Sequence, residues 1–206
     1  GKLIEDSDAI FITVPDNAIT EVYRQVAEFE IQDKYICHCS GACTAEEAFP
    51  GIHTQGAYAI SIHLLFPISS KYNCWRELAG AFFCVEGDAK AVEVFVPLLR
   101  GLGLQVQTIS PESKAQYHLS CALASNFVCA LVQRSAELLG GCGFSQTDAL
   151  HALAPLMRSN LAHVIEHGAV SALTGPIERG DTQTVQKHLS CGTLAALLNR
   201  EKEQNE

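Results

Sequence analysis

The chain has 206 residues, of which 48% are hydrophobic and 18% are charged, a balance that supports a packed core and excludes a disordered chain. Its formal net charge of −9 argues against nucleic acid or an anionic membrane as a partner. We find neither an uninterrupted apolar run near the roughly 18 residues of a membrane helix nor an N-terminal signal peptide. At about 100–200 residues per domain, we expect one large domain or two small ones.

Nine cysteines are present, an odd number, and most lie within apolar runs. Without a secretory signal, this pattern favours free thiols in a reducing cytoplasm over disulfides. The cluster Cys37-His38-Cys39 with Cys43 invites a zinc interpretation. However, Cys37 and Cys39 would share one face of a strand while His38 points to the other, and no second Cys/His pair has suitable spacing. We therefore predict no metal site.

The first half of the chain alternates between strand and helix patterns. Helices are predicted from Asp16 to about residue 29 and over 89–99, with Asp16 and Asp88 as their N-terminal caps. The strands between them are predicted at 9–14, 35–39, 57–65, 81–85 and 104–109. This alternation indicates an α/β domain over residues 1–109, with a mostly parallel sheet covered by helices.

The second half, residues 110–206, is predicted to be an all-α domain. Ser110-Pro111-Glu112 starts a helix over 111–139, which is apolar on nearly every side between 119 and 132 and therefore resembles the central helix of a bundle. A second helix begins at Ser145-x-x-Asp148, contains Pro155 as a candidate kink and ends at Gly168. Asp181 caps a last helix, and the charged tail 200–206 is expected to fray.

The ends of three predicted strands carry the first candidate site residues. In open α/β sheets, ligands bind at the carboxyl ends of the strands, and the helix start at Asp16 offers N–H donors to an anion. The alternative is ordinary turn chemistry in which Asp16 only caps a helix. The candidates are Val14, Pro15, Asp16, Ser40, Gly41 and His63.

The long predicted helix carries the second set. Lys114, His118 and Ser125 lie within about 40° of one another on a helical wheel, and Asn126 lies about 120° from Lys114. A lysine near a histidine in apolar surroundings has a lowered pKa, which suits proton donation to a carbonyl oxygen. The alternative places Lys114 and His118 in exposed first turns, with Asn126 as a structural tie between helices.

The loop 174–181 is rich in glycine, proline and charge. Arg179 could hold a carboxylate or a phosphate, while Gly175 and Gly180 would let a ligand approach the backbone. The alternative is a purely structural loop that ends one helix and starts the next.

Several motifs together resemble an uncharacterised family of Rossmann-like oxidoreductases with a C-terminal helical domain of unknown function. It belongs to the clan of pyrroline-carboxylate reductases, hydroxyisobutyrate dehydrogenases and prephenate dehydrogenases. The resemblance implies a doubly wound Rossmann-like domain, NADP or NAD as cofactor, and a homodimer formed through the helical domain. The matching segments are 12–19 (ITVPDNAI), 38–42 (HCSGA), Lys114-x-x-Tyr117-His118, 124–127 (ASNF) and 173–181 (LTGPIERGD).

The resemblance also implies roles for individual residues. Lys114 is similar to the catalytic lysine of the clan, and His118 stands where the hydroxyacid dehydrogenases have an asparagine, with Asn126 further on. His63 is similar to the histidine of a His-Pro motif but is followed by Leu64. Val14, Pro15, Asp16, Ser40 and Gly41 are expected to border the cofactor.

The glycine fingerprint G-x-G-x-x-G occurs nowhere in the chain, and the resemblance begins at the fourth Rossmann strand. We therefore expect a partial Rossmann domain without the pyrophosphate cradle. Either about 60–90 preceding residues are missing from this sequence, at about 30 per βαβ unit, or the protein is a natural variant that cannot bind a dinucleotide in the usual way.

Two functions remain open from the sequence, and a purely structural oligomer is a third possibility. The first is an NAD(P)-dependent oxidoreductase of a small carbonyl/imine or hydroxy/amino substrate, with Lys114 and His118 handling the proton. Asn126, His63, Ser125 and Arg179 would bind the substrate. The second is a non-catalytic, dimeric sensor of a dinucleotide or metabolite.

Overall fold

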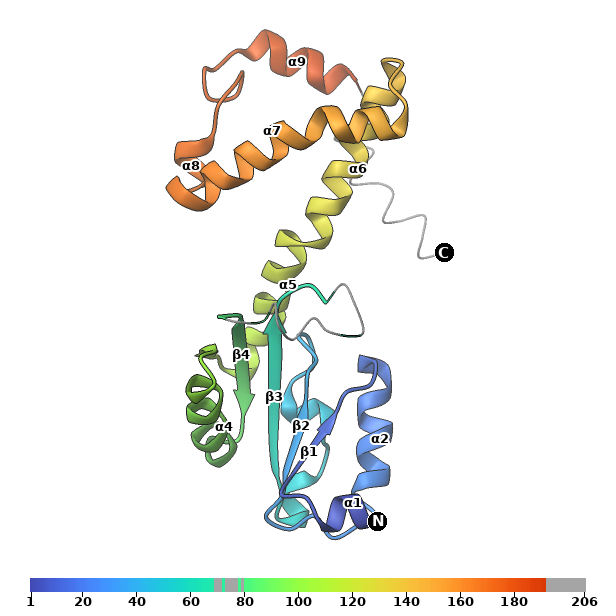
Figure 1. Cartoon of the computed structure of the whole chain (residues 1–206), viewed down its shortest axis with the longest axis vertical. Helices are drawn as coiled ribbons and strands as arrows, with labels where there is room; N and C mark the ends of the chain where they lie inside the picture. Colours follow the sequence, from blue (N-terminus) through green and yellow to red (C-terminus); the bar gives the residue numbers. More distant parts are fainter. Residues whose placement is uncertain (69–71, 73–77, 79, 192–206) are drawn as a thin grey trace. The chain divides into compact units, whose positions relative to one another are not determined.

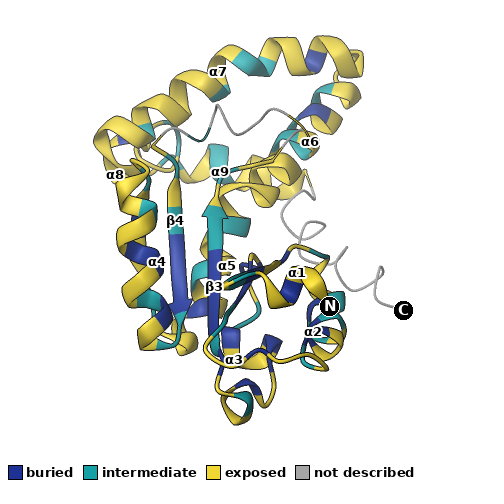
Figure 2. Ribbon diagram, turned by 60° about the horizontal axis from the view of Figure 1, so that its bottom comes forward, coloured by how far each residue is buried: buried dark blue, intermediate teal, exposed yellow. Residues whose placement is uncertain are grey.

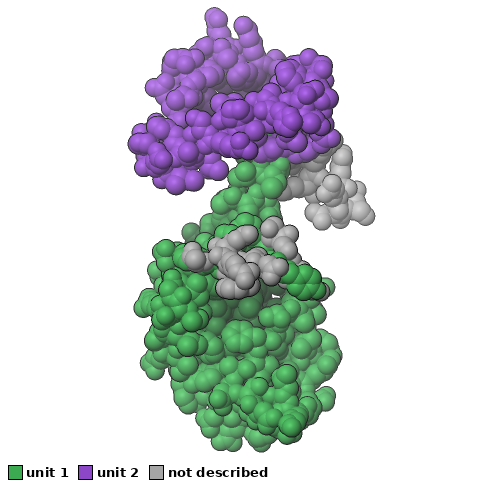
Figure 3. All heavy atoms as spheres, viewed as in Figure 1, with its two compact units in different colours: residues 1–131 green, residues 132–206 purple. Residues whose placement is uncertain are grey.

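The computed structural model describes residues 1–68, 72, 78 and 80–191, in two compact units that are described separately. The first unit comprises Gly1–Leu131 and the second Val132–Glu206 (Figure 3). The helix that begins at Lys114 therefore belongs to the same compact unit as the sheet. The domain boundary that we predict at residue 109 stays a prediction. Cys74 and the tail 200–206 lie outside the described residues.

A five-stranded mixed sheet forms the centre of the first unit and confirms the predicted α/β fold (Figure 1). Its order is β1-β2-β3-β4-β5, with β3 and β4 antiparallel and all other neighbours parallel. β3 is mostly buried, as expected for a strand that is covered on both faces, whereas β5 (QVQT) buries only Val106. The strands are β1 Ala9–Ile12, β2 Tyr35–His38, β3 Tyr58–Leu65, β4 Phe82–Gly87 and β5 Gln105–Thr108.

Helices cover both faces of this sheet, and each face has its own apolar core (Figures 1 and 2). On one face, α2 (Ile19–Val26) and α3 (Ala45–Ala48) bury residues such as Tyr23 and Phe49. On the other, α4 (Ala89–Gly101) packs against β3, β4 and β5, and its Phe95 ring contacts Phe11 of β1 and Tyr35 of β2. The remaining short helices are α1 Lys2–Glu5 and the 3-10 turns Asp16–Ala18, Ile52–Gln55 and Pro111–Ser113.

After β5, the described chain consists of helices joined by loops. Two predicted caps are confirmed: the Ser145 hydroxyl accepts a hydrogen bond from the Asp148 N–H, and the Asp181 carboxylate accepts one from the Thr184 N–H. Pro155 lies inside α7. These helices are α5 Lys114–Ala124, α6 Asn126–Gly141, α7 Gln146–His167, α8 Ala169–Ala172 and α9 Thr182–Ser190.

The expected single helix over 111–139 is wrong, because it breaks at Ser125. That residue has φ −120° and ψ −76°, and its hydroxyl donates back to the Cys121 carbonyl, a local bond that competes with the helical pattern. The expected burial of 119–132 is also wrong, since Leu119 and Leu123 are 54% and 50% exposed. By length and composition alone, the run Pro111–Gly141 could cross a membrane, and none of its most apolar window is buried.

Two of the predicted helix caps have other partners. The Asp16 carboxylate accepts a hydrogen bond from Ser40 instead of from its own helix. Asp88 stands at the N-cap of α4, but its carboxylate accepts the Ala59 N–H and contacts His53. Both carboxylates therefore connect segments distant in sequence, which a local capping pattern does not reveal.

The described cysteines include seven free thiols, and no group of three His, Cys, Asp or Glu side chains in the described part of the chain could hold a metal ion. Cys37 packs in the α4-side core, whereas His38 contacts Phe49 on the opposite face, as the strand alternation predicts. The seven thiols are Cys37, Cys39, Cys43, Cys84, Cys121, Cys129 and Cys142.

Candidate active site

Four paired residues form a row across the sheet at the carboxyl ends of β1 and β2. Ile12 pairs with His38, His38 with Ser61, and Ser61 with Glu86. Because residues directly opposite each other project from the same face of a sheet, His38, Ser61 and Glu86 share one face. All three are buried. Buried polar side chains in an otherwise aliphatic sheet require partners, and this row is therefore a candidate functional site.

Lys114, the first residue of α5, is the main partner of the row. Its Nζ donates to the Ser61 hydroxyl and to Glu86 Oε2, the latter at 3.2 Å, and the side chains of Lys114 and Glu86 are each only 3% exposed. Burial lowers the pKa of Lys114, and the Glu86 carboxylate opposes this shift. Glu86 Oε2 also accepts the N–H of Ala45 at 3.0 Å. The alternative that left Lys114 exposed is therefore wrong.

The loop after β2 ties the strand ends together through Ser40. Its hydroxyl donates to Asp16 Oδ2 at 2.7 Å and accepts the N–H groups of Ala42 and Cys43. Its carbonyl oxygen accepts the Ser61 hydroxyl at 3.2 Å. Four of the predicted residues at these strand ends are thus adjacent in space or sequence: Val14, Pro15, Asp16 and Ser40.

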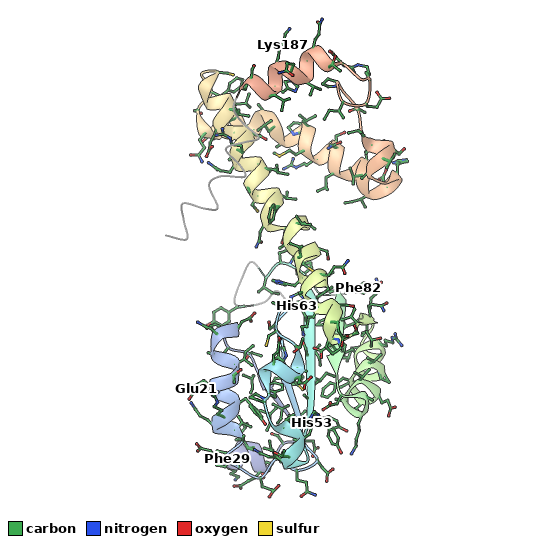
Figure 4. The ribbon with its side chains drawn as sticks, turned by 180° about the vertical axis from the view of Figure 1, so that it is seen from behind. Glu21, Phe29, His53, His63, Phe82 and Lys187 are labelled. Carbon is green, nitrogen blue, oxygen red and sulfur yellow. The ribbon has the colours of Figure 1, made fainter. Side chains whose placement is uncertain are left out.

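Two histidines meet at Gly41. His63 lies two residues beyond Ser61 on the same face of β3, and its ring centroid is 6.1 Å from that of His118 on α5. A Cβ atom added to Gly41 would lie 2.5 Å from His118 Cδ2 and 2.8 Å from His63 Nε2. Gly41 is therefore required for the close approach of this loop to both rings. Figure 4 shows His63 at the end of the sheet from which α5 starts, with His53 at the opposite end.

The imidazoles near Lys114 have shifted pKa values. Burial, and next the charge of Lys114, lower the pKa of His38 to about 4, and its Nδ1 accepts the Ser40 N–H at 3.2 Å. Burial first, then the neighbouring His118 and Lys114, lower the pKa of His63. At neutral pH both rings are therefore neutral, next to a buried ammonium group.

Three other predicted residues have hydrogen bonds elsewhere in the described part of the chain. Ser125 and Asn126 lie at the break between α5 and α6, where the Ser125 hydroxyl oxygen is 3.3 Å from Asn126 Oδ1. Arg179 belongs to the second unit, where its N–H donates to the Gly175 carbonyl at 3.2 Å. Their roles in substrate binding stay predictions.

The sequence interpretation missed three residues of the site: Ser61, Glu86 and Tyr117. A carboxylate in the strand sequence FFCVEG and a hydroxyl in AISIHLL are both unusual for buried strands, and that was an available signal. Tyr117 occurs in a quoted motif, but its contact with His63 joins residues 54 positions apart.

A surface hollow lies elsewhere, at the amino ends of β2 and β3. Its lining contains two carboxylates and, within the described residues, no lysine, histidine or cysteine, so it lacks the donors of the site at the carboxyl ends. The lining residues are Glu28, Phe29, Glu30, Gln32, Thr54, Gln55 and Gly56.

A family model described as a domain of unknown function (DUF2520) matches residues 81–205, which is more than half of the chain. The chain belongs to the DUF2520 family. This match confirms the family resemblance and includes Glu86, Lys114, Tyr117 and His118 of the site. No curated protein matches the sequence.

Solved structures share the fold of this DUF2520 chain. Protein TM1727 from Thermotoga maritima is 27% identical, with a TM-score of 0.70 over 88% of this chain and 68% of that chain. Protein BF3122 from Bacteroides fragilis, provisionally classed as an NADP oxidoreductase, is 17% identical, with a TM-score of 0.71 over 98% and 76%. An NADH-preferring ketol-acid reductoisomerase from an uncultured archaeon is 16% identical, with a TM-score of 0.63 over 99% and 70%. These likenesses support a Rossmann-like sheet followed by a helical part.

Proposed function

We propose that this DUF2520 protein is an NAD(P)-dependent oxidoreductase that acts on a small carbonyl/imine or hydroxy/amino substrate. The observation that carries the proposal is the approach of two imidazoles to Gly41, together with the buried ammonium group of Lys114 at Ser61, at the carboxyl ends of β1 and β2. This is the edge at which open α/β sheets bind their ligands.

The proposed chemistry divides between a hydride and a proton. A nicotinamide cofactor supplies or accepts the hydride, and a protein group must then exchange a proton with the substrate oxygen or nitrogen. His118 is exposed beside Gly41 and takes this role, while the buried charge of Lys114 stabilises negative charge that develops on the substrate. Asn126, Ser125 and Arg179 are proposed to position the substrate.

The proposed cofactor site is the loop after β2 together with the end of β1. Val14, Pro15, Asp16, Ser40 and Gly41 would border the cofactor, next to the His63 and His118 rings that pack against Gly41. The neighbours provisionally classed as NADP-dependent or named as NADH-preferring support a nicotinamide dinucleotide. The residues that distinguish NADP from NAD follow a glycine fingerprint that these 206 residues do not contain.

Two further proposals concern the setting. We propose a homodimer formed through the helical part, which exposes many leucines, and a reducing cytoplasmic environment that keeps the seven described thiols free.

The test uses the full-length product of the reading frame that contains this chain. Titration with NADPH and with NADH, followed by nicotinamide fluorescence, should give a saturable signal for at least one of them. Panels of aldehydes, ketones, imines and their reduced forms are then screened by nicotinamide absorbance. Replacing His118 with Ala should reduce turnover by about 10²–10⁴-fold, the usual contribution of general acid–base catalysis.

His53→Ala is the matched control, because His53 lies at the opposite end of the sheet and should leave turnover unchanged (Figure 4). Saturable binding without turnover of any substrate would favour the alternative function, a non-catalytic sensor. No saturable binding of either dinucleotide would overturn both functions.

A further inference from the structure

We propose that Tyr117 is a positioning residue that holds His63 in the tautomer with its proton on Nε2, so that His63 presents a fixed N–H donor beside Gly41. The proposal rests on the proposed function, because it names the donor that would face the substrate. It assigns a task to Tyr117, which the proposed reaction does not otherwise use.

The geometry places the two nitrogens of His63 in different surroundings. Nδ1 lies 2.6 Å from the Tyr117 hydroxyl, a distance typical of a strong hydrogen bond to a hydroxyl group. Nε2 faces the Gly41 loop, 2.8 Å from the position that a Cβ atom would occupy there. The two rings meet edge to face at 5.6 Å, so that Tyr117 also fixes the ring plane of His63.

The direction of the hydrogen bond decides the tautomer. Burial raises the pKa of Tyr117, with smaller contributions from Cys84 and Cys121, so the phenol keeps its proton. The acceptors near that proton are imidazole Nδ1 and the sulfur of a thiol, and a neutral imidazole nitrogen is much the stronger acceptor. When the phenol donates to Nδ1, the hydrogen of the neutral ring must be on Nε2.

The opposite arrangement would have Nδ1–H donating to the phenol oxygen. In that arrangement the Tyr117 hydroxyl must donate to a thiol sulfur, which is a weak acceptor, and the Nε2 atom that faces Gly41 carries no proton. Since a low pKa keeps His63 neutral, only the Nε2–H form can donate to a ligand at this position. An atom bound there must therefore offer a lone pair, as a carbonyl or carboxylate oxygen does.

The decisive experiment reads the tautomer directly. Long-range proton–nitrogen NMR spectra of the ¹⁵N-labelled protein at pH 7.5 distinguish Nε2–H from Nδ1–H imidazoles by their nitrogen shifts. A His63→Gln spectrum assigns the His63 signals. We expect the Nε2–H pattern in the wild type, and its loss or averaging with Nδ1–H in Tyr117→Phe, which keeps the aromatic ring.

Tyr58→Phe is the control, because Tyr58 lies at the other end of β3 and its hydroxyl accepts from Lys90; the His63 pattern should not change. An Nδ1–H pattern in the wild type overturns the proposal, even if Tyr117→Phe fails to fold. So does an unchanged Nε2–H pattern in a folded Tyr117→Phe variant. Because the spectra need no cofactor or substrate, a protein that failed to bind dinucleotide would refute the proposed function but not this tautomer.

Discussion

Lys114 and Glu86 illustrate how the site combines stability with chemistry at the scale of single residues. Removing two charges from water costs several kcal/mol, and their attraction and hydrogen bonds must repay this. Ser61 and the Ala45 N–H supply the additional hydrogen bonds. The pair therefore holds α5 and α3 to the sheet while placing a positive charge at the strand ends.

Breaking this pair should be costly. Glu86→Gln leaves the ammonium group buried without a counter-charge, and we expect a loss of about 3–5 kcal/mol in the free energy of unfolding. Replacing both partners, as in Lys114→Met with Glu86→Leu, should cost clearly less than the sum of the two single changes. Urea denaturation of the wild type, Lys114→Met, Glu86→Leu and the double variant measures the cycle, and Glu86→Gln is measured beside them. Additive losses would show that the two side chains do not depend on each other.

The lowered pKa of His38 leads us to predict that the stability of the protein depends on pH. The His38 pKa is lowered to about 4 in the folded protein, so the unfolded chain binds its proton first as the pH falls. Stability should thus be complete above about pH 6.5 and decline toward pH 4, by up to about 1.4 kcal/mol per pH unit. The lowered pKa of His63 adds in the same direction.

Denaturation at several pH values, followed by amide NMR signals of β2, measures this slope. His38→Gln should flatten the profile between pH 6.5 and 4. Equal slopes in the two proteins would mean that folding does not lower the pKa of His38.

At the scale of elements, α3 is a four-residue helix with an unusually complete N-terminus. The Thr44 hydroxyl accepts the Glu47 N–H, and the Glu47 carboxylate accepts the Thr44 N–H in return. Such a capping box satisfies two backbone donors that a short helix would otherwise leave without partners. It also directs the next N–H, that of Ala45, toward Glu86.

Removal of this cap should weaken the first unit. We expect Thr44→Ala to lower the free energy of unfolding by about 1 kcal/mol. Thr20→Ala, in the first turn of α2, where the N-cap makes no side-chain hydrogen bond, is the control and should change it by less than about 0.5 kcal/mol. Thermal unfolding of the three proteins tests this, and equal effects of the two substitutions would contradict a capping role.

Elements were predictable where a local pattern decides them. The strands follow from β-branched runs, and the caps at Ser145 and Asp181 follow from nearby residues. The row of Ser61 and Glu86 was not predictable, because it depends on the register of strands far apart in sequence. For the same reason, Asp16 looked like a cap while its partner, Ser40, lies 24 residues away.

At the scale of the whole molecule, the apolar surface of α5 and α6 requires an explanation. Monomeric proteins rarely expose large contiguous apolar patches, and the patch here includes Leu119 and Leu123, one helical turn apart. The family resemblance implies that a second copy covers it.

Light scattering at micromolar concentration should therefore give twice the mass of one chain. Leu119→Glu with Leu123→Glu should shift the protein to the monomer, because two carboxylates would be buried in the interface. Leu102→Glu, at an exposed site after α4, should leave the dimer intact. A monomeric wild type would refute the dimer. Binding of the wild type to lipid vesicles, if the double substitution abolished it, would also refute the dimer, because a membrane would then cover this patch.

The row from Ile12 to Glu86 has a further consequence for how the sheet assembles. A slip of one residue between two strands would turn every side chain of one strand to the opposite face. His38, Ser61 or Glu86 would then enter the aliphatic layer under α4 without partners, at a cost of several kcal/mol each. The groups that make this edge chemically useful thus also penalise misaligned strands. Substitutions in the loops and in α5 could change the substrate without affecting strand alignment. Substitution of His38, Ser61 or Glu86 would also remove the energetic penalty on misaligned strands.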